Sequence, residues 1–219
     1  MKAAGPSTAA IVLAGGRATR MGGADKPLQM LGSRPLIGHV MAALAPQCAA
    51  LVINANGDVA RLASLGAPVV PDELPGFPGP LAGILAGLDH VAAQRPDLEF
   101  AVSAATDTPF LPDDLVAQLH AARAAAGAEI AIARSDNSVH PTFALWPIRL
   151  RTDLREALVE DDLRRVTSFF ARYSRAYADW GIDPFDPFFN VNTPDDLQRA
   201  EEILAARDSA ISRAAQSQK

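Results

Sequence analysis

The chain has 219 residues and a mass of 23.1 kDa, which predicts one large domain or at most two small ones. Hydrophobic residues make up 49% of the chain and charged residues 21%, so a disordered or fibrous protein is excluded. The net charge of −5 argues against a nucleic-acid-binding protein, and no apolar run reaches the roughly 20 residues that cross a bilayer.

Short apolar runs alternate with helix-like segments through the first half of the chain. Strands are expected at residues 9–14, 50–54, 69–70 and 100–104. Helices are expected at residues 35–45, 59–65 and 81–93, the first with a proline in its first turn. Residues 17–34 are polar and basic and contain glycines, which predicts a long loop.

The second half continues the alternation and ends on a helix. A helix is expected at residues 112–126 and strands at 129–133, 142–146 and 175–178. Residues 148–172 are expected to be helical, with a break near Asp161 and Asp162. Thr193 and Pro194 suit the N-cap and the first position of a last helix, which is predicted to run to about Ala206. The polar residues 207–219 predict a frayed tail.

This order of elements predicts an α/β fold in which residues 1–219 form one domain of three layers, a mostly parallel sheet with helices on both faces. Ligands of such sheets bind beyond the carboxyl ends of the strands. The residues that follow the strands are therefore the candidates for a functional site, namely Gly15, Gly16, Asn54, Asp72, Asp107 and the segment 190–193.

The number of cysteines indicates the cellular compartment in which the protein is expected. Cys48 is the only cysteine, which excludes an internal disulfide framework and a cysteine metal cluster. No secretory signal is visible in residues 1–8. Both observations predict a cytoplasmic protein.

The loop at residues 13–26, LAGGRATRMGGADK, follows a strand and leads toward a helix, which is the setting of a phosphate-binding loop. Its glycines allow backbone N–H groups to approach phosphate oxygens. It contains neither a Walker A sequence nor a GxGxxG turn. Residues 1–40 carry a charge of +4 and the rest of the chain −9, which favours a local anion site. The alternative is a basic surface loop.

Lys26 is the only lysine away from the chain ends, in a sequence with 17 arginines and three lysines. A site that needs a compact point charge would use lysine, because the planar guanidinium of arginine would not fit there. The alternative is that the single interior lysine is a matter of chance.

Six motifs are spread over nearly the whole chain. In order, they are LAGG-x-x-x-RMGG-x-DK at 13–26, VINAN at 52–56, PGPLAG at 78–83, TDTPFL at 106–111, HPTFAL at 140–145 and NVNTPDDL at 190–197. Together they resemble the motifs of the molybdenum cofactor guanylyltransferases. The resemblance implies a Rossmann-like nucleotidyltransferase fold, with a nucleotide-binding half at 9–110 and a pterin-substrate half at 111–206.

The reaction that this resemblance implies is transfer of GMP from GTP to the terminal phosphate of molybdopterin, with release of pyrophosphate and with Mg²⁺ as the metal. A phosphate nucleophile is already anionic, so positioning and charge neutralisation suffice for catalysis. Transient contacts with cofactor-handling proteins or recipient molybdoenzymes are also implied, with no nucleic-acid or membrane partner.

The resemblance also implies roles for single residues. Lys26 would neutralise phosphate charge and Asp107 would hold Mg²⁺, since a carboxylate suits a hard ion. The residues expected to contact the nucleotide are Leu13, Ala14, Gly15, Gly16, Lys26, Asn54, Asp72 and Asp107. The residues expected on the pterin side are His140, Arg165, Asn190 and Asn192. For Asn190 and Asn192 the alternative is plain turn geometry, and for Arg165 a solvated helical face.

Two other classes of protein remain open at this stage. One is a related transferase, a molybdenum cofactor cytidylyltransferase or a sugar-phosphate nucleotidyltransferase. Cytidylyltransferase relatives resemble LAAG at residues 13–16 and DIDTP at 190–194, where this chain has LAGG and NVNTP, so both departures favour guanine. The other class is a non-catalytic GTP-binding carrier of the cofactor. The presence of both Lys26 and Asp107 argues against it, because binding alone needs no complete charge-neutralising set.

Overall fold

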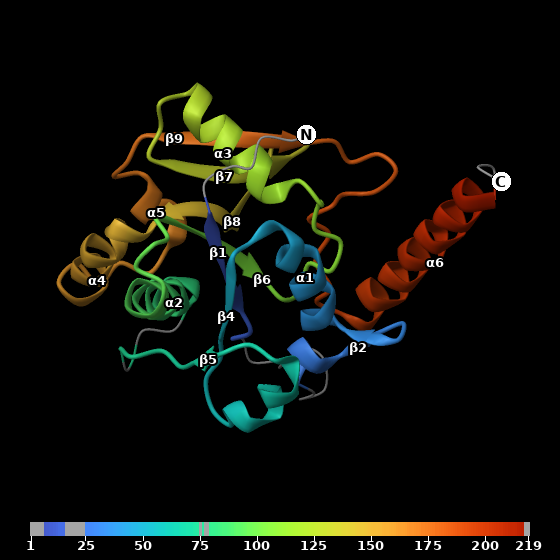
Figure 1. The fold of residues 1–219 in the computed structure, drawn as a ribbon, viewed down its shortest axis with the longest axis horizontal. Coiled ribbons are helices and arrows are strands. Elements are labelled where there is room, and N and C mark those ends of the chain that lie inside the picture. The colour runs from blue at the N-terminus through green and yellow to red at the C-terminus, as the bar shows by residue number, and fades with distance from the viewer. Residues whose placement is uncertain (1–6, 16–24, 75, 77–78, 217–219) are drawn as a thin grey trace.

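A seven-stranded sheet forms the centre of the molecule (Figure 1). The computed structural model describes residues 7–15, 25–74, 76 and 79–216, with side chains described through Ser209. In sheet order the strands are β5 (Val69–Val70), β4 (Ala50–Asn54), β1 (Thr8–Leu13), β6 (Phe100–Ala105), β8 (Ser138–Pro147), β7 (Ile130–Ser135) and β9 (Arg175–Trp180). Only β8 runs antiparallel to its neighbours, so the expected mostly parallel α/β sheet is confirmed.

Helices cover both faces of the sheet. The α-helices are α1 (Leu36–Leu44), α2 (Pro80–Gln94), α3 (Leu115–Ala125), α4 (Arg151–Val159), α5 (Val166–Phe170) and α6 (Pro194–Gln216). The 3-10 helices are η1 (Lys26–Leu28), η2 (Ala45–Gln47), η3 (Val59–Leu65) and η4 (Ile148–Leu150). None of the helices in the described part of the chain combines the length and apolar character needed to cross a membrane.

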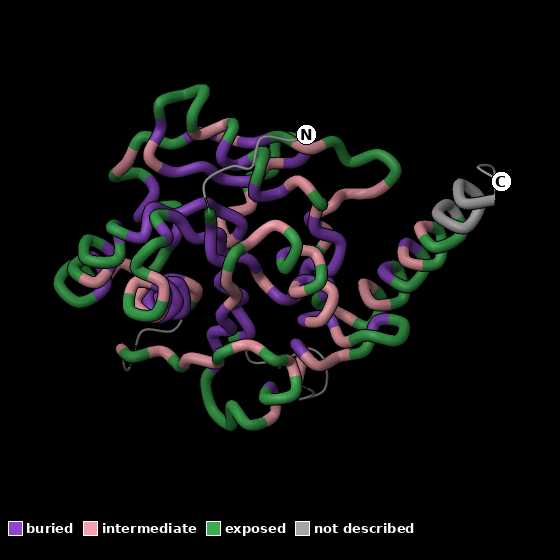
Figure 2. The backbone as a smooth tube through the Cα atoms, in the orientation of Figure 1, coloured by how far each residue is buried: buried purple, intermediate pink, exposed green. Residues whose placement is uncertain are grey.

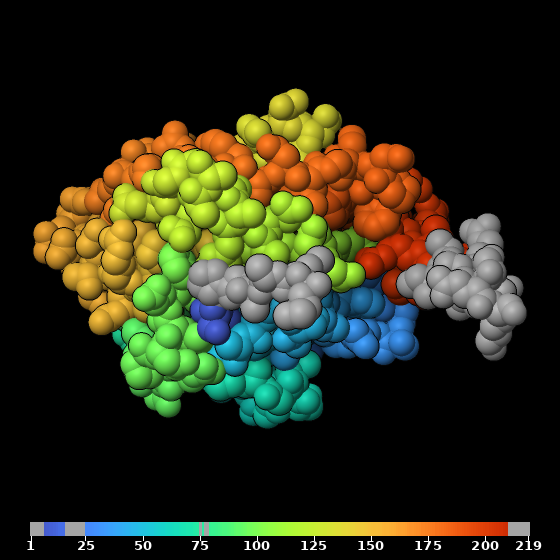
Figure 3. Space-filling view, turned by 45° about the horizontal axis from the view of Figure 1, so that its top comes forward, coloured from blue at the N-terminus to red at the C-terminus, as the bar shows by residue number. Residues whose placement is uncertain are grey.

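Side chains along each strand point alternately to the two faces of the sheet, so a hydrophobic core forms on each face. In β1, Ile11 packs into the core with α2, α4 and α5, whereas Ala10 and Val12 pack into the core with α1 and α3. All six residues of β1 are buried, because the strand is covered from both sides. Figure 2 shows the central strands as the most continuously buried part of the chain. On one face, α3 lies beside β9, as the space-filling view shows (Figure 3).

The largest differences from the sequence-based expectation lie in two segments. The expected loop at 17–34 contains, in its described part, η1 and a short hairpin of β2 (Met30–Leu31) and β3 (Arg34–Pro35), which turns at Gly32 with a φ of 59°. The expected end of the last helix at Ala206 is wrong, since α6 continues to Gln216. Residues 207–216 are polar but contain no glycine or proline that would end a helix.

The strand register brings the carboxyl ends of four strands to one edge of the sheet. Leu13 of β1 pairs with Asn54 of β4 on one side and with Ala105 of β6 on the other. Asn54 in turn pairs with Val70 of β5. The segments that follow these strands therefore begin next to one another, and they carry most of the candidate residues.

Candidate functional site

A lysine, an aspartate and an asparagine meet at the carboxyl edge of the sheet. The Lys26 Nζ donates hydrogen bonds to Asp107 Oδ2 at 2.8 Å and to Asn192 Oδ1 at 2.6 Å. Lys26 begins η1, Asp107 follows β6, and Asn192 precedes α6. The Lys26 and Asp107 side chains are 17% and 24% exposed, so the pair is shielded but open to a ligand. The structure thus joins three predicted site residues in one cluster.

An ion pair fixes the backbone next to Lys26. The carboxylate of Asp25 pairs with the guanidinium of Arg61, which lies in η3. The carbonyl of Asp25 also accepts a hydrogen bond from the Leu28 N–H at 2.9 Å, which closes the turn of η1. The sequence alone does not single out Arg61, because its role depends on a tertiary contact with Asp25, which is 36 residues away in the chain.

The start of α6 fixes Asn192. The carboxylate of Asp196 accepts hydrogen bonds from the backbone N–H groups of Asn192 and Thr193, both at 2.9 Å. In return the Thr193 hydroxyl oxygen accepts the Asp196 N–H at 3.1 Å, so Thr193 caps the helix as predicted. The hydrogen bond from the Asn192 N–H is the largest cause that lowers the pKa of Asp196. The cap that orders the start of α6 thereby also sets the position of Asn192, whose side-chain amide contacts Lys26.

Asn54 and Asp72 lie together at the neighbouring strand ends. The Asn54 side-chain amide donates to Asp72 Oδ1 at 2.9 Å and to the Val70 carbonyl at 3.1 Å. Asn56 also contacts Asp72, with its amide 2.7 Å from Asp72 Oδ2. In the sequence, Asn56 stands out only as the last residue of VINAN, without a predicted role.

The first strand's end is close to these residues. The Ala14 N–H donates to the Asn54 carbonyl at 2.8 Å, and the Leu13 carbonyl accepts the Thr106 N–H at 3.3 Å. Leu13 and Ala14 are buried, while Gly15 is exposed. Gly16, the other predicted member of this group, lies outside the described residues.

Gly83 of α2 lets Asn54 lie against the helix. A Cβ added at Gly83 would stand 2.1 Å from Asn54 Oδ1, so the Asn54 side chain would have to move, and 3.2 Å from a methyl group of Leu13, which is a tight contact. A glycine inside a helix costs about 1 kcal/mol relative to alanine, so its use here needs a packing reason. A glycine in the interior of a predicted helix is therefore the sequence signal that marks Gly83.

The remaining predicted residues lie apart from the lysine cluster. Asn190 Oδ1 accepts the Thr108 hydroxyl at 2.9 Å, next to the segment that holds Asp107. His140 shares a hydrogen bond of 2.7 Å with the Ser135 hydroxyl, and its ring stacks on Phe188 with centroids 4.6 Å apart. Burial lowers the pKa of His140. Arg165 is exposed just before α5. Among the described residues, no hydrogen bond or ion pair links His140 or Arg165 to Lys26.

Within the described residues, no three or more histidine, cysteine, aspartate or glutamate side chains are grouped as a metal site. Two oxygens nevertheless converge at one point: the carboxylate oxygen of Asp107 and the amide oxygen of Asn192 both accept a hydrogen bond from Lys26 Nζ. Carboxylate and amide oxygens are ligands that hard divalent cations accept.

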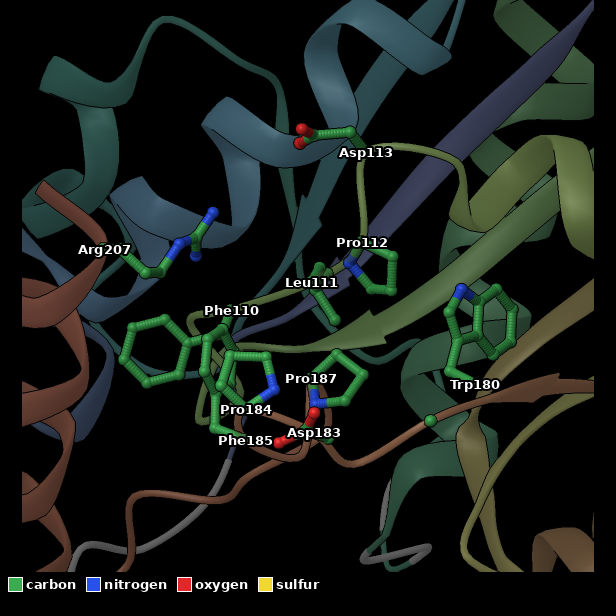
Figure 4. A pocket seen from close by; sticks show the side chains of 11 residues that line it. Phe110, Leu111, Pro112, Asp113, Trp180, Asp183, Pro184, Phe185, Pro187 and Arg207 are labelled. Atoms are coloured by element: carbon green, nitrogen blue, oxygen red, sulfur yellow. The ribbon is translucent and has the colours of Figure 1, made fainter. Parts of the chain in front are cut away.

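A separate pocket of about 260 Å³ lies between the segment after β6 and the connection from β9 to α6 (Figure 4). Its wall includes Phe110, Trp180, Phe185 and Arg207. The Arg207 guanidinium lies 5.8 Å from the ring centroids of both Phe110 and Phe185. None of the predicted site residues lines this pocket, so it is distinct from the lysine cluster.

Comparisons with known proteins identify the family of the chain. Residues 10–176 match the family model described as the MobA-like NTP transferase domain. The chain is 58% identical over 204 residues to a molybdenum cofactor guanylyltransferase of Rhodopseudomonas palustris (strain BisB5), covering 93% of this chain and 97% of the relative. It is 56% identical over 198 residues to the protein of the same name from Bradyrhizobium sp. (strain ORS 278), covering 90% and 93%.

A solved structure gives the same result at the level of the fold. The molybdopterin-guanine dinucleotide biosynthesis protein A of Archaeoglobus fulgidus superimposes with a TM-score of 0.71 and 29% identity, covering 91% of this chain and 100% of that one. A 4-diphosphocytidyl-2C-methyl-D-erythritol synthase from Anaerococcus prevotii has a TM-score of 0.69, with 91% and 96% covered. At 13% identity this second likeness concerns the fold alone.

Proposed function

The chain belongs to the molybdenum cofactor guanylyltransferase family, and from this premise we propose that Lys26, Asp107 and Asn192 form its reaction centre. The enzyme transfers GMP from GTP to the terminal phosphate of molybdopterin, which yields the guanine dinucleotide cofactor and pyrophosphate. The observation that carries the assignment of the site is the convergence of Asp107 Oδ2 and Asn192 Oδ1 on the Lys26 ammonium, at 2.8 and 2.6 Å.

The cluster suits a reaction that needs charge neutralisation more than proton transfer. The attacking phosphate of molybdopterin is an anion, so no strong general base has to activate it. The leaving pyrophosphate carries more negative charge as the bond breaks, and the Lys26 ammonium is placed to stabilise that charge. Lys26 and Asp107 belong to the proposed nucleotide-binding half at 9–110, whereas Asn192 belongs to the proposed pterin half at 111–206. The reaction centre therefore lies where the two halves meet.

A divalent cation is typical of this family, and we assign Mg²⁺ to Asp107. The fit rests on the two oxygens of Asp107 and Asn192 that already surround a cationic nitrogen. Mg²⁺ is commonly held by one or two protein oxygens together with substrate phosphates. When bound there, the ion would draw charge from the phosphates that surround the transferred phosphorus.

The neighbouring strand ends form the proposed nucleotide-binding surface. Asn54 and Asp72 are joined by a hydrogen bond of 2.9 Å, and Gly15 lies beside them, 4.0 Å from Asn54 Oδ1 when measured from an added Cβ. The absence of a side chain at Gly15 lets a large base approach the backbone, which supports guanine as the base. Leu13, Ala14 and Gly16 complete this proposed surface.

The pterin side is assigned to His140, Arg165 and Asn190. Asn190 is the best supported of the three, because it is two residues from Asn192 and bonds to Thr108, the residue after Asp107.

We also propose transient contacts with cofactor-handling proteins or recipient molybdoenzymes, and a cytoplasmic location. Burial raises the pKa of Cys48, the only cysteine, to about 12, which fits a thiol that stays reduced.

Nucleotide titration and a turnover assay test the proposal. In calorimetry with Mg²⁺, GTP is expected to bind at least about tenfold tighter than CTP or ATP. Equal affinities, or a preference for CTP, would remove the guanylyl assignment.

In a pyrophosphate-release assay with GTP and molybdopterin, Asp107→Ala should lose about 100-fold or more in turnover. A variant within threefold of the wild type would show that Asp107 does not hold the metal. Binding of GTP without any release would indicate a carrier instead of an enzyme.

A further inference from the structure

Asn56 holds Asp72 by two hydrogen bonds at once. Its amide donates to Asp72 Oδ2 at 2.7 Å, and its side-chain oxygen accepts the Asp72 backbone N–H at 2.9 Å. Together the two bonds close a ring between the side chain of Asn56 and both the backbone and the carboxylate of Asp72. The bond to Oδ2 restricts rotation of the Asp72 side chain about its χ angles, and the bond from the backbone N–H fixes Asn56 relative to the chain at Asp72.

The register of β4 and β5 explains why Asn54 and Asn56 both meet Asp72. Ile53 pairs with Val69 and Asn54 with Val70, so a continuation of the two strands places Asn56 opposite Asp72. Residues two apart in an extended strand point to the same side. The Asp72 carboxylate therefore accepts one amide on each oxygen, from Asn54 on Oδ1 and from Asn56 on Oδ2.

The two asparagines differ in burial. Asn54 is 4% exposed and is enclosed by Gly83 and the strand ends, whereas Asn56 is exposed at the surface. Because the Asn56 side chain is exposed, it does not fill the core, and its two hydrogen bonds act to hold Asp72 in position. A carboxylate can accept about four hydrogen bonds. After the two amides, Asp72 keeps capacity for N–H or O–H donors of a ligand.

We propose that Asn56 is a positioning residue that orients the Asp72 carboxylate toward the nucleoside part of GTP. The proposal rests on the proposed function, because Asp72 is assigned there to the nucleotide. Asn56 itself touches neither the lysine cluster nor any reacting atom, so its loss should weaken GTP binding and leave the chemical step nearly unchanged.

A double-mutant cycle measured by GTP titration tests this. Asn56→Ala should weaken GTP binding about fivefold, since one or two hydrogen bonds to Asp72 are lost. In the Asp72→Ala background the same change should have no effect, because Asn56 then has no carboxylate to orient. Asn56→Asp should weaken binding more than Asn56→Ala, because it puts a second carboxylate against Asp72 Oδ2.

Three controls keep the result specific. Asp58→Ala removes a hydrogen bond of 3.0 Å to the Ala60 N–H in the same exposed loop without touching Asp72, and it should leave GTP binding unchanged. Binding of pyrophosphate, which has no nucleoside, should be equal in the wild type and in Asn56→Ala. The KM for GTP should rise in Asn56→Ala while kcat stays within twofold of the wild type.

Each outcome separates this inference from the proposed function. If Asp72→Ala weakens GTP binding and Asn56→Ala does not, Asn56 has no positioning role and the nucleotide assignment of Asp72 stands. If Asn56→Ala weakens binding equally with and without the Asp72 carboxylate, it acts by another route and the inference is overturned. If Asp72→Ala leaves GTP binding unchanged, the assignment of Asp72 to the nucleotide fails first, and the role of Asn56 fails with it.

Discussion

The Lys26 ammonium lies 2.8 Å from a carboxylate oxygen of Asp107, although 81 residues separate them in the chain. Asn192, a further 85 residues along, places its amide oxygen 2.6 Å from the same nitrogen. One cation is thus held by two oxygens from different segments. The geometry has consequences for the shape of the cationic group, for the binding of metal and for the neighbouring nucleotide surface.

The first prediction concerns the shape of the cation. Lys26→Arg keeps the positive charge but replaces a compact ammonium by a longer planar guanidinium. The guanidinium can still pair with Asp107, yet its charge would lie at a different point relative to the phosphates. A displacement of about 1 Å can cost about 100-fold in rate, so kcat for pyrophosphate release should fall by that order. Thermal unfolding should be unchanged, and full activity would show that the single interior lysine is accidental.

The second prediction concerns competition between the lysine and a metal ion. The Lys26 ammonium lies between the Asp107 and Asn192 oxygens. Lys26→Met removes this charge and leaves the oxygens available, so nucleotide-free protein should bind Mn²⁺ on the order of tenfold more tightly than the wild type. The measurement is titration of Mn²⁺ by electron paramagnetic resonance, which needs no turnover.

The double variant Lys26→Met/Asp107→Ala provides the control for this titration. It should lose the added affinity, because the carboxylate that would hold the ion is gone. An unchanged Mn²⁺ affinity in Lys26→Met would mean that the ammonium and the metal do not share a position. GTP should raise the Mn²⁺ affinity of the wild type, since its phosphates give the lysine a different partner and add ligands to the ion.

Much of this centre follows from the sequence alone. Lys26 is the only interior lysine and lies in the loop after the strand predicted at 9–14, and Asp107 comes soon after the strand predicted at 100–104, so the rule for parallel sheets places both near one edge. The same rule places Asn54 and Asp72 at this edge, whereas the hydrogen bond between them depends on the pairing of β4 with β5. What the sequence could not supply is the register between strands, which decides that Asn56 faces Asp72. It also could not supply the ion pair of Asp25 with Arg61, since arginines of similar context occur throughout the chain.

The third prediction concerns Gly83. Alanine in place of a helical glycine normally stabilises a helix by about 1 kcal/mol. At Gly83 the added Cβ would stand 2.1 Å from Asn54 Oδ1, so the Asn54 side chain must move and its hydrogen bond to Asp72 is lost. Gly83→Ala should therefore weaken GTP binding about tenfold, as measured by calorimetry, with only a small change in the free energy of unfolding.

Gly87 of the same helix is the matched control for Gly83. A Cβ there would stand 2.5 Å from a methyl group of Ile11, which belongs to the buried core of β1. Gly87→Ala should lower the free energy of unfolding by about 1–3 kcal/mol through overpacking. The folded fraction should keep its affinity for GTP. Equal losses of stability in the two variants would contradict the separate roles given to the two glycines.

The fourth prediction concerns the dependence of stability on pH. His120 is 6% exposed, and its Nε2 shares a hydrogen bond of 2.7 Å with the Thr8 hydroxyl. Burial, with a smaller effect of Arg123, lowers the pKa of His120 from 6.5 to about 4. Between these values the unfolded chain binds a proton at this histidine and the folded chain does not, so the free energy of unfolding falls as the pH falls. From pH 7 to pH 4 the loss is at most about 3 kcal/mol.

His120→Gln isolates this contribution in urea unfolding at pH 4, 5, 6 and 7. The variant is expected to be less stable than the wild type at pH 7, because the ring no longer packs edge-on against Phe100 at 5.1 Å. Its stability should nevertheless fall less steeply toward pH 4. Asp97, Asp179 and Asp196 have pKa values lowered below 3.8, so their stabilising contributions begin to be lost toward pH 4. Both proteins contain these carboxylates, so that loss cancels when the two curves are compared. Parallel curves for the two proteins would show that the neutral form of His120 contributes nothing to stability.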